Sequence, residues 1–206
     1  MRVPWSTYRN IYVKSRKAAE RVMISITKFI EEDLMLKVNK EKSKVDRPWK
    51  LKYLGFTFYP KKGEMGIRVH EKSVEKLKAM LKKITGRSNA MSMEFRSIKL
   101  RQVIIGWINY FKLADMKSTL RSLDEWLRRR IRLCYWKQWK KIKTKHDNLN
   151  LLGIEEYKAW EYASTRKGYW RISNSPILAR TLTNKYLKEQ GFITLTESYL
   201  RLGNSY

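Results

Sequence analysis

Residues 121–145 combine many cationic side chains with several aromatic rings, a pairing of residue types suited to binding nucleic acid. The segment has ten Lys and Arg residues against Asp124 and Glu125. Arg and Lys neutralise phosphates, and exposed indole or phenol rings stack on unpaired bases. The residues of this segment predicted to bind RNA are Arg128, Arg129, Arg130, Arg132, Trp136, Lys137, Trp139, Lys140 and Lys141.

The alternative for this segment is a surface helix whose tryptophans belong to the core. Trp126, Trp136 and Trp139 cannot all share one Leu/Ile stripe, so we expect at least one of them at a surface or an interface. The Leu and Ile positions of the stripe are spaced for the opposite side of the helix from most of the arginines. Nucleic-acid binding remains the favoured interpretation.

Residues 166–171 form a second candidate, in which cations flank a glycine and two adjacent aromatic rings. This composition suits the unpaired bases of RNA loops better than a duplex groove. The alternative is a tight turn closed by a tryptophan. The residues predicted to bind RNA here are Arg166, Lys167, Tyr169, Trp170 and Arg171.

The composition indicates a globular chain with a polyanionic partner. The chain has 206 residues, with 46 Lys plus Arg against 19 Asp plus Glu and a formal net charge of +27. Hydrophobic residues are 43% of the chain, which excludes disorder throughout. A surface this basic repels itself unless an anion offsets the charge, which favours nucleic acid over a basic surface with no specific partner. An acidic membrane is disfavoured, because the cations are not confined to one amphipathic helix and no apolar run approaches a span.

Residue types that would build a metal site or a nucleophilic active site are scarce. The lone cysteine, Cys134, lies on the apolar side of a helical pattern, which predicts a buried structural thiol. His70 and His146 are far apart, and we expect His146 to be exposed in a loop. Acidic neighbours on one helix point about 100° apart and form no shared metal cage, so we expect them to be solvated. These neighbours lie at 31–33, 124–125 and 155–156. The residues alone predict no catalytic group, no metal and no cofactor.

The elements that must position these residues change in type near residue 70. Alternation predicts a short strand over 10–14, and Ser15 then caps a helix that ends near Asp33. A strong strand over 51–59 is expected to end at Pro60 and to pair with residues 67–69 as a hairpin. The first part of the chain therefore mixes strands with a helix.

From Glu71 onward the apolar spacing is helical. One helix is expected to stop at Gly86, a second to begin at Ser92, and a third near Ser118. Two shorter helices should follow, separated by Gly153 and Gly168, with one final helix from about residue 176. The fold class is therefore α+β, with a small hairpin followed by an all-helical remainder.

Several motifs resemble the group II intron-encoded reverse transcriptase/maturase proteins of bacteria. Gly-Trp-Ile-Asn-Tyr-Phe at 106–111 and Leu-Asp-Glu-Trp-Leu-Arg-Arg-Arg at 123–130 look like their maturase-specific (X) region. The motifs at 36–43 and 53–56 resemble the last palm motifs of the reverse transcriptase domain, and 166–178 resembles the C-terminal segment. The resemblance implies a palm remnant at 1–66, thumb-like helices at 67–115 and an RNA-binding region at 116–206, with Leu54, Gly55 and Phe56 in a primer-grip position.

The sequence departs from this family where polymerase chemistry would lie. The family's Tyr-Ala-Asp-Asp turn should precede 10–14, yet Trp5-Ser6-Thr7-Tyr8 stands there. A Thr hydroxyl or a phenol does not hold Mg²⁺ as a carboxylate does, so we expect no polymerase activity from this chain alone. The resemblance implies a truncated relative that binds group II intron RNA and assists its splicing.

Three functional alternatives follow from the resemblance. The chain is a maturase-like RNA-binding fragment, one half of a split reverse transcriptase completed by a separate fingers–palm chain, or a non-functional remnant. A DNA target or primer is a further candidate partner, and no membrane partner is expected. We expect a cytoplasmic protein, with association with the bacterial nucleoid left open.

Overall fold

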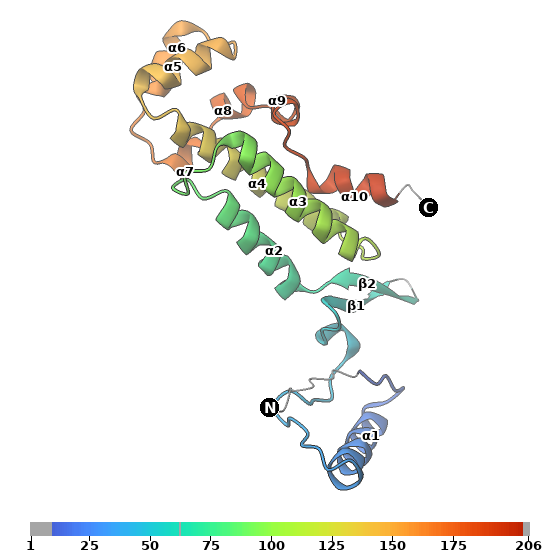
Figure 1. The fold of residues 1–206 in the computed structure, drawn as a ribbon. Coiled ribbons are helices and arrows are strands. Elements are labelled where there is room, and N and C mark those ends of the chain that lie inside the picture. The colour runs from blue at the N-terminus through green and yellow to red at the C-terminus, as the bar shows by residue number, and fades with distance from the viewer. Residues whose placement is uncertain (1–9, 62, 204–206) are drawn as a thin grey trace. The chain divides into compact units, whose positions relative to one another are not determined.

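The computed structural model describes residues 10–61 and 63–203, and these fall into two compact units. The first unit spans Met1–His70 and the second spans Glu71–Tyr206 (Figure 1). Helices dominate the described residues, with one two-stranded antiparallel sheet, so the predicted α+β class is confirmed. The finer division at residues 66 and 115 stays a prediction. No helix in the described parts of the chain is long and apolar enough to cross a membrane.

The first unit begins with helix α1, Arg16–Lys28, which runs into a π-helical turn over Phe29–Asp33. Ser15 caps α1 as predicted, with its hydroxyl accepting from the backbone N–H of Ala18. The strand predicted over 10–14 is wrong, because this segment has no regular structure. A strand needs a neighbour to bond its backbone, and in the described residues the sheet consists of β1 and β2 only.

The hairpin pairs β1, Phe56–Lys61, with β2, Glu64–Val69. Its existence confirms the prediction, but the strand continues through Pro60, which faces Met65. Proline lacks a donor and is tolerated here because a two-stranded sheet consists of edges only. Tyr59 faces Gly66, and a Cβ at that glycine would lie 2.5 Å from the Tyr59 ring. The glycine therefore makes the space that this cross-strand ring occupies.

The segment predicted to hold the primer-grip-like strand is a turn in the structure. Leu54 and Gly55 both have positive φ, +49° and +87°, and the backbones of Tyr53 and Phe56 bond across them. Two consecutive positive φ values build the tight turn that joins hairpin arms. Phe56 begins β1, so the predicted strand start at residue 51 is wrong, whereas a role for this turn in gripping a primer stays a prediction.

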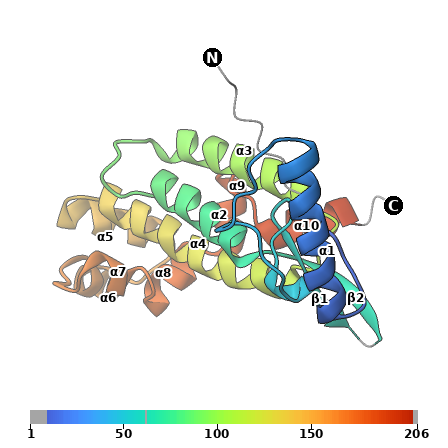
Figure 2. The same ribbon diagram turned by 90° about the horizontal axis from the view of Figure 1, so that it is seen from below.

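Three long helices form the framework of the second unit. They are α2, Glu71–Ile84, α3, Met93–Phe111, and α4, Lys117–Gln138. Helix α2 packs against both α3 and α4, as Figures 1 and 2 show. The fully buried core side chains of these helices include Leu77, Leu81, Leu100, Ile104, Ile108 and Leu120. The three helices and the Ser92 cap of α3 lie where the apolar spacing predicted them.

The connection between α2 and α3 is held by a buried arginine. Arg96, 4% exposed, donates to the carbonyls of Ile84, Gly86 and Met91 and to Oδ1 of Asn89. The Ile84 carbonyl is the last one of α2, and the guanidinium both satisfies it and complements the negative end of the helix dipole. Arg96 therefore fixes where α3 starts relative to α2.

The chain beyond α4 forms shorter helices. An α5–α6 pair, Ile142–Leu151 and Glu156–Ala163, is followed by α7, Tyr169–Ile172, α8, Pro176–Thr181, α9, Asn184–Glu189, and α10, Leu195–Gly203. The single final helix predicted from residue 176 is therefore wrong. Thr183 starts a new helix by accepting from the N–H of Tyr186, and Gly191, at φ +84°, ends it. Helix α10 packs against α3 and α4.

Candidate nucleic-acid interface

Helix α4 has two chemically different sides. The apolar side is buried as predicted and includes Leu123, Leu127, Ile131 and Cys134. The thiol of Cys134 donates to the carbonyl of Thr85 at 3.4 Å, and burial raises its pKa. This group is the buried structural thiol that the sequence predicted, not an exposed nucleophile.

Two of the arginines predicted to bind RNA are hydrogen-bonded within the protein. Arg130 donates to Oγ1 of Thr85 at 2.6 Å and to the carbonyls of Thr85 and Lys82 at 2.8 and 3.2 Å. Arg132 donates to the carbonyl of Leu182 at 3.2 Å. Burial lowers the pKa of both guanidiniums, which stay charged because arginine titrates so high. Their main contacts stabilise the fold.

Arg129 joins the two predicted clusters. Its guanidinium carbon lies 3.8 Å from the ring centre of Trp170, and its Nη2 donates to the Trp170 carbonyl at 2.8 Å. The neighbouring Tyr169 ring has Lys137 at 5.3 Å and Arg87 at 5.1 Å. Cation–π contacts of this kind hold the four-residue helix α7 against α4 and against the connection between α2 and α3, where Arg87 lies. Residues 121–145 and 166–171 therefore form one surface.

Two predicted stacking residues, Trp136 and Trp139, lie in the core. They are only 2% and 7% exposed, and their rings pack edge to face at 6.1 Å. Tyr135, beside them, packs against Tyr186 of α9 and Phe192 of the connection between α9 and α10. Later elements thus cover the second side of α4 near its end. The structure assigns these two rings to packing, because no indole face is left open for a base.

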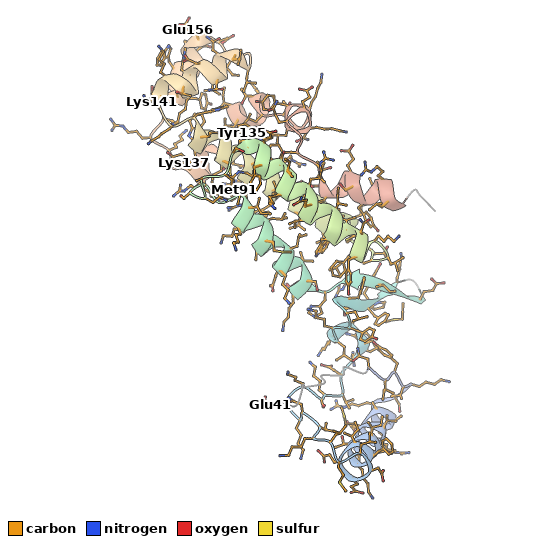
Figure 3. The ribbon with its side chains drawn as sticks, in the orientation of Figure 1. Glu41, Met91, Tyr135, Lys137, Lys141 and Glu156 are labelled. Atoms are coloured by element: carbon orange, nitrogen blue, oxygen red, sulfur yellow. The ribbon has the colours of Figure 1, made fainter. Side chains whose placement is uncertain are left out.

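The exposed cations lie where α4 ends and beside α7. Lys140, Lys141, Arg166, Lys167 and Arg171 are exposed, whereas Arg128, Arg129 and Lys137 are half-buried. Within the described ranges none of the cations at 121–145 forms an ion pair with a carboxylate. Figure 3 marks Lys137 and Lys141 at the end of α4 where α5 begins. We call these eight cationic residues, five exposed and three half-buried, the basic surface. Its exposed members are available to phosphates.

A pocket of about 440 Å³, which the sequence did not predict, opens beside α7. It is lined by Glu75, Lys78, Ala79, Lys82, Trp126, Arg130 and Trp170. Lys78 and Arg130 lie 5.3 and 5.4 Å from the Trp126 ring. Lys78 and Lys82 belong to a helix whose apolar stripe suggested only packing. Lysines recur on the other side of this helix, and this repeat was the signal in the sequence that could have indicated the pocket.

Two expectations about individual residues are wrong. His146 is not in an exposed loop but buried in α5, where its ring stacks on Trp160 at 4.0 Å and Nδ1 lies 3.0 Å from Oδ1 of Asp147. Asp124 is not solvated: its carboxylate is buried and accepts from the N–H groups of Leu195 and Thr196. It therefore caps α10, because a helix leaves its first N–H groups without internal partners.

The carboxylates do not gather into a metal site. In the part of the chain that the structure describes, no three His, Cys, Asp or Glu side chains come together as a metal cluster would need. The stretch Trp5-Ser6-Thr7-Tyr8, where the family's aspartates would stand, lies outside the described residues. Among the described residues, the basic surface and the pocket beside α7 present mainly cations and aromatic rings.

Part of the basic surface lies in a segment that matches a known protein family. Residues 74–153 match the family model "Group II intron, maturase-specific domain". No curated protein matches the chain. The matched segment covers most of α2 and all of α3, α4 and α5, and it includes the residues of the basic surface on α4 and just after it but not those beside α7. Over residues 74–153 the chain is therefore similar to the group II intron maturase-specific domain, and this similarity suggests a maturase-like role in splicing.

Proposed function

We propose that this chain binds group II intron RNA and supports its splicing by stabilising the folded RNA. The observation that carries the proposal is that Arg129 joins α4 to α7 within and beside the matched maturase region. This contact puts exposed cations next to half-exposed aromatic rings. A structured RNA packs phosphates closely, so cations that neutralise them favour its compact fold. Catalysis of splicing would belong to the RNA.

The basic surface supplies a predictable electrostatic contribution. Each phosphate that it neutralises adds roughly 0.7 to 0.9 to the slope of log affinity against log salt. Lys140, Lys141, Arg166 and Lys167 are exposed and free of carboxylate partners in the described structure, so we assign phosphate contacts to them. Arg130 and Arg132 contribute to RNA binding mainly by stabilising the fold, because they bond the end of α2 and the Leu182 carbonyl to α4.

Paired double variants test this assignment. We expect Arg166→Ala/Lys167→Ala to reduce affinity for a group II intron RNA several-fold and to flatten the salt dependence. The matched control Lys117→Ala/Lys185→Ala also removes two exposed cations of the second unit, outside the basic surface. Equal losses in the two double variants would mean that total charge alone drives binding and would refute the assignment.

No polymerase activity is proposed for the chain alone. Thr7 and Tyr8 stand where the family's metal-binding aspartates would be, and neither side chain is a ligand of the same kind for Mg²⁺. Primer extension on an RNA template, with a reverse transcriptase as the positive control, should therefore give no DNA product. We further propose a cytoplasmic location, which follows from the proposed RNA partner.

A second candidate function is supported by the first unit. Within α1 of the described chain no side chain is buried, and Ile24 and Phe29 are 70% and 52% exposed. Met35 and Leu36, after the π turn, are 84% and 60% exposed. Apolar exposure on this scale favours a covering partner. A separate fingers–palm chain that completes a split reverse transcriptase would provide it, and DNA synthesis by the mixed chains but by neither alone would show this.

A further inference from the structure

The pocket beside α7 has the size and lining of a small-ligand site. Its volume of about 440 Å³ lies toward the lower end of the range of ligand pockets, too small for a duplex but adequate for one nucleotide. Two indole rings from different helices, Trp126 of α4 and Trp170 of α7, contribute to its wall. Trp170 is 41% exposed, so one of its faces can take a planar partner while Arg129 occupies the other.

The cations around the pocket divide into fixed and movable groups. Arg130 is held by three hydrogen bonds to the end of α2, and Arg129 is held by the Trp170 carbonyl. Lys78 and Lys82 are exposed, and in the described structure neither ammonium is paired with a carboxylate. Their flexible side chains can turn toward a phosphate while the arginines keep the indoles in place.

We propose that this pocket receives one unpaired RNA base, stacked on Trp170 beside Trp126, with the adjoining phosphate bound by Lys78 and Lys82. This inference rests on the proposed function and names the part of the RNA that the site recognises. Glu75 is the one carboxylate of the pocket lining, and it repels phosphate but accepts hydrogen bonds from a base. Glu75 lies one turn of α2 before Lys78, so we expect the phosphate beside Lys78 and Lys82 and the base edge within reach of Glu75.

The base and the backbone can be separated experimentally. The probes are a single-stranded RNA of about ten nucleotides and the same ribose–phosphate backbone without bases, which carry equal charge. Stacking of one base predicts roughly ten-fold tighter binding of the oligomer with bases. Because stacking releases no counterions, this ratio should persist when salt is raised, although both affinities fall. Equal binding of the two probes would overturn the pocket assignment.

Variants locate the preference in the pocket. Trp170→Ala should abolish the preference for bases, so that the two probes bind alike, and Trp170→Phe, which keeps an aromatic face for the base, should restore part of the preference. Trp160→Ala is the matched control, because Trp160 is exposed to a similar degree, 43% against 41%, but lies in α6. Loss of the preference in Trp160→Ala, or equal loss of both probes in Trp170→Ala, would contradict the proposal.

The failure of this inference differs from failure of the proposed function. If the intron RNA binds selectively but the two short probes bind alike, the pocket proposal is wrong and the proposed function stands. If neither the intron RNA nor either probe binds at low salt, the proposed function is wrong, and the pocket proposal with it. Circular dichroism melts of each variant show that the compared proteins are folded.

Discussion

Arg129 and Trp170 are joined by two contacts, a guanidinium stacked 3.8 Å from the ring centre and a 2.8 Å hydrogen bond to the backbone carbonyl. They lie 41 residues apart, and their contact unites the two basic–aromatic clusters of the sequence. Helix α7 has four residues and no side-chain cap at its start, so its position depends on contacts of this kind.

Arg129→Ala should therefore release α7. We expect faster amide hydrogen exchange over 169–173 and a loss of about 1–2 kcal/mol in the free energy of unfolding, from the lost cation–π contact and charge-assisted hydrogen bond. Arg128→Ala removes the same charge from the adjacent position and serves as the control. Unchanged exchange at α7 in Arg129→Ala would show that other contacts hold this helix.

Asp124→Ala should destabilise the packing of α10. The buried carboxylate accepts from the N–H groups of Leu195 at 2.7 Å and Thr196 at 2.9 Å, and removing it leaves these donors without their partner. We expect a loss of about 1–3 kcal/mol in urea unfolding. Glu125→Ala, at an exposed neighbouring position, should change stability by less than about 0.5 kcal/mol. Similar values for the two variants would refute the capping role.

Trp136→Ala and Lys140→Ala/Lys141→Ala should affect different properties. Truncating the buried Trp136 leaves a cavity and should reduce the free energy of unfolding by about 3–5 kcal/mol. Removing the two exposed lysines should change it by less than about 0.5 kcal/mol yet weaken RNA binding several-fold. Thermal melts and RNA titrations of both variants separate these effects. Weaker RNA binding by Trp136→Ala without a loss of stability would show that the Trp136 ring contacts RNA.

Stability should fall in alkaline solution. Burial raises the pKa of Cys134 and of Tyr135 above their ordinary values of 9.0 and 10.0, and the neighbouring Tyr186 adds to the effect on Tyr135. The unfolded chain then loses these protons first as pH rises, so stability present below about pH 9 is lost above it. Urea midpoints from neutral pH to about pH 10.5 should fall less in Tyr135→Phe than in the native chain. The exposed Tyr110→Phe is the control, and identical slopes in all three would contradict this origin.

The sequence contained enough information to place the hairpin and the helices over 71–138. Their apolar residues repeat at helical spacing, and Ser92 marks a start that local chemistry alone determines. The strand predicted over 10–14 failed because strands depend on partners that local alternation does not reveal. The sequence predicted one final helix from about residue 176, whereas the structure has α8, α9 and α10 there, because Thr183 starts a new helix and Gly191 ends it.

Site residues were predictable by type but not by exposure. The cations beside α7 follow from composition, whereas composition does not reveal that Trp136 is buried or that Tyr186 and Phe192 pack onto the neighbouring Tyr135. Likewise, Arg130 and Arg132 bond to carbonyls that are 45 and 50 residues away in the chain. Tertiary contacts of this range override the local pattern, so a count of cations overestimates those that can reach RNA.

The central claim is selective binding of intron RNA, and titration of the purified chain with two RNAs tests it most directly. One RNA is a group II intron and the other an unrelated RNA of equal length, each titrated at low and at raised salt. We predict a preference for the intron that survives the raised salt, because shape and stacking contacts do not depend on counterion release. Equal binding of both RNAs that collapses together with salt would contradict the claim and leave only non-specific attraction to a polyanion.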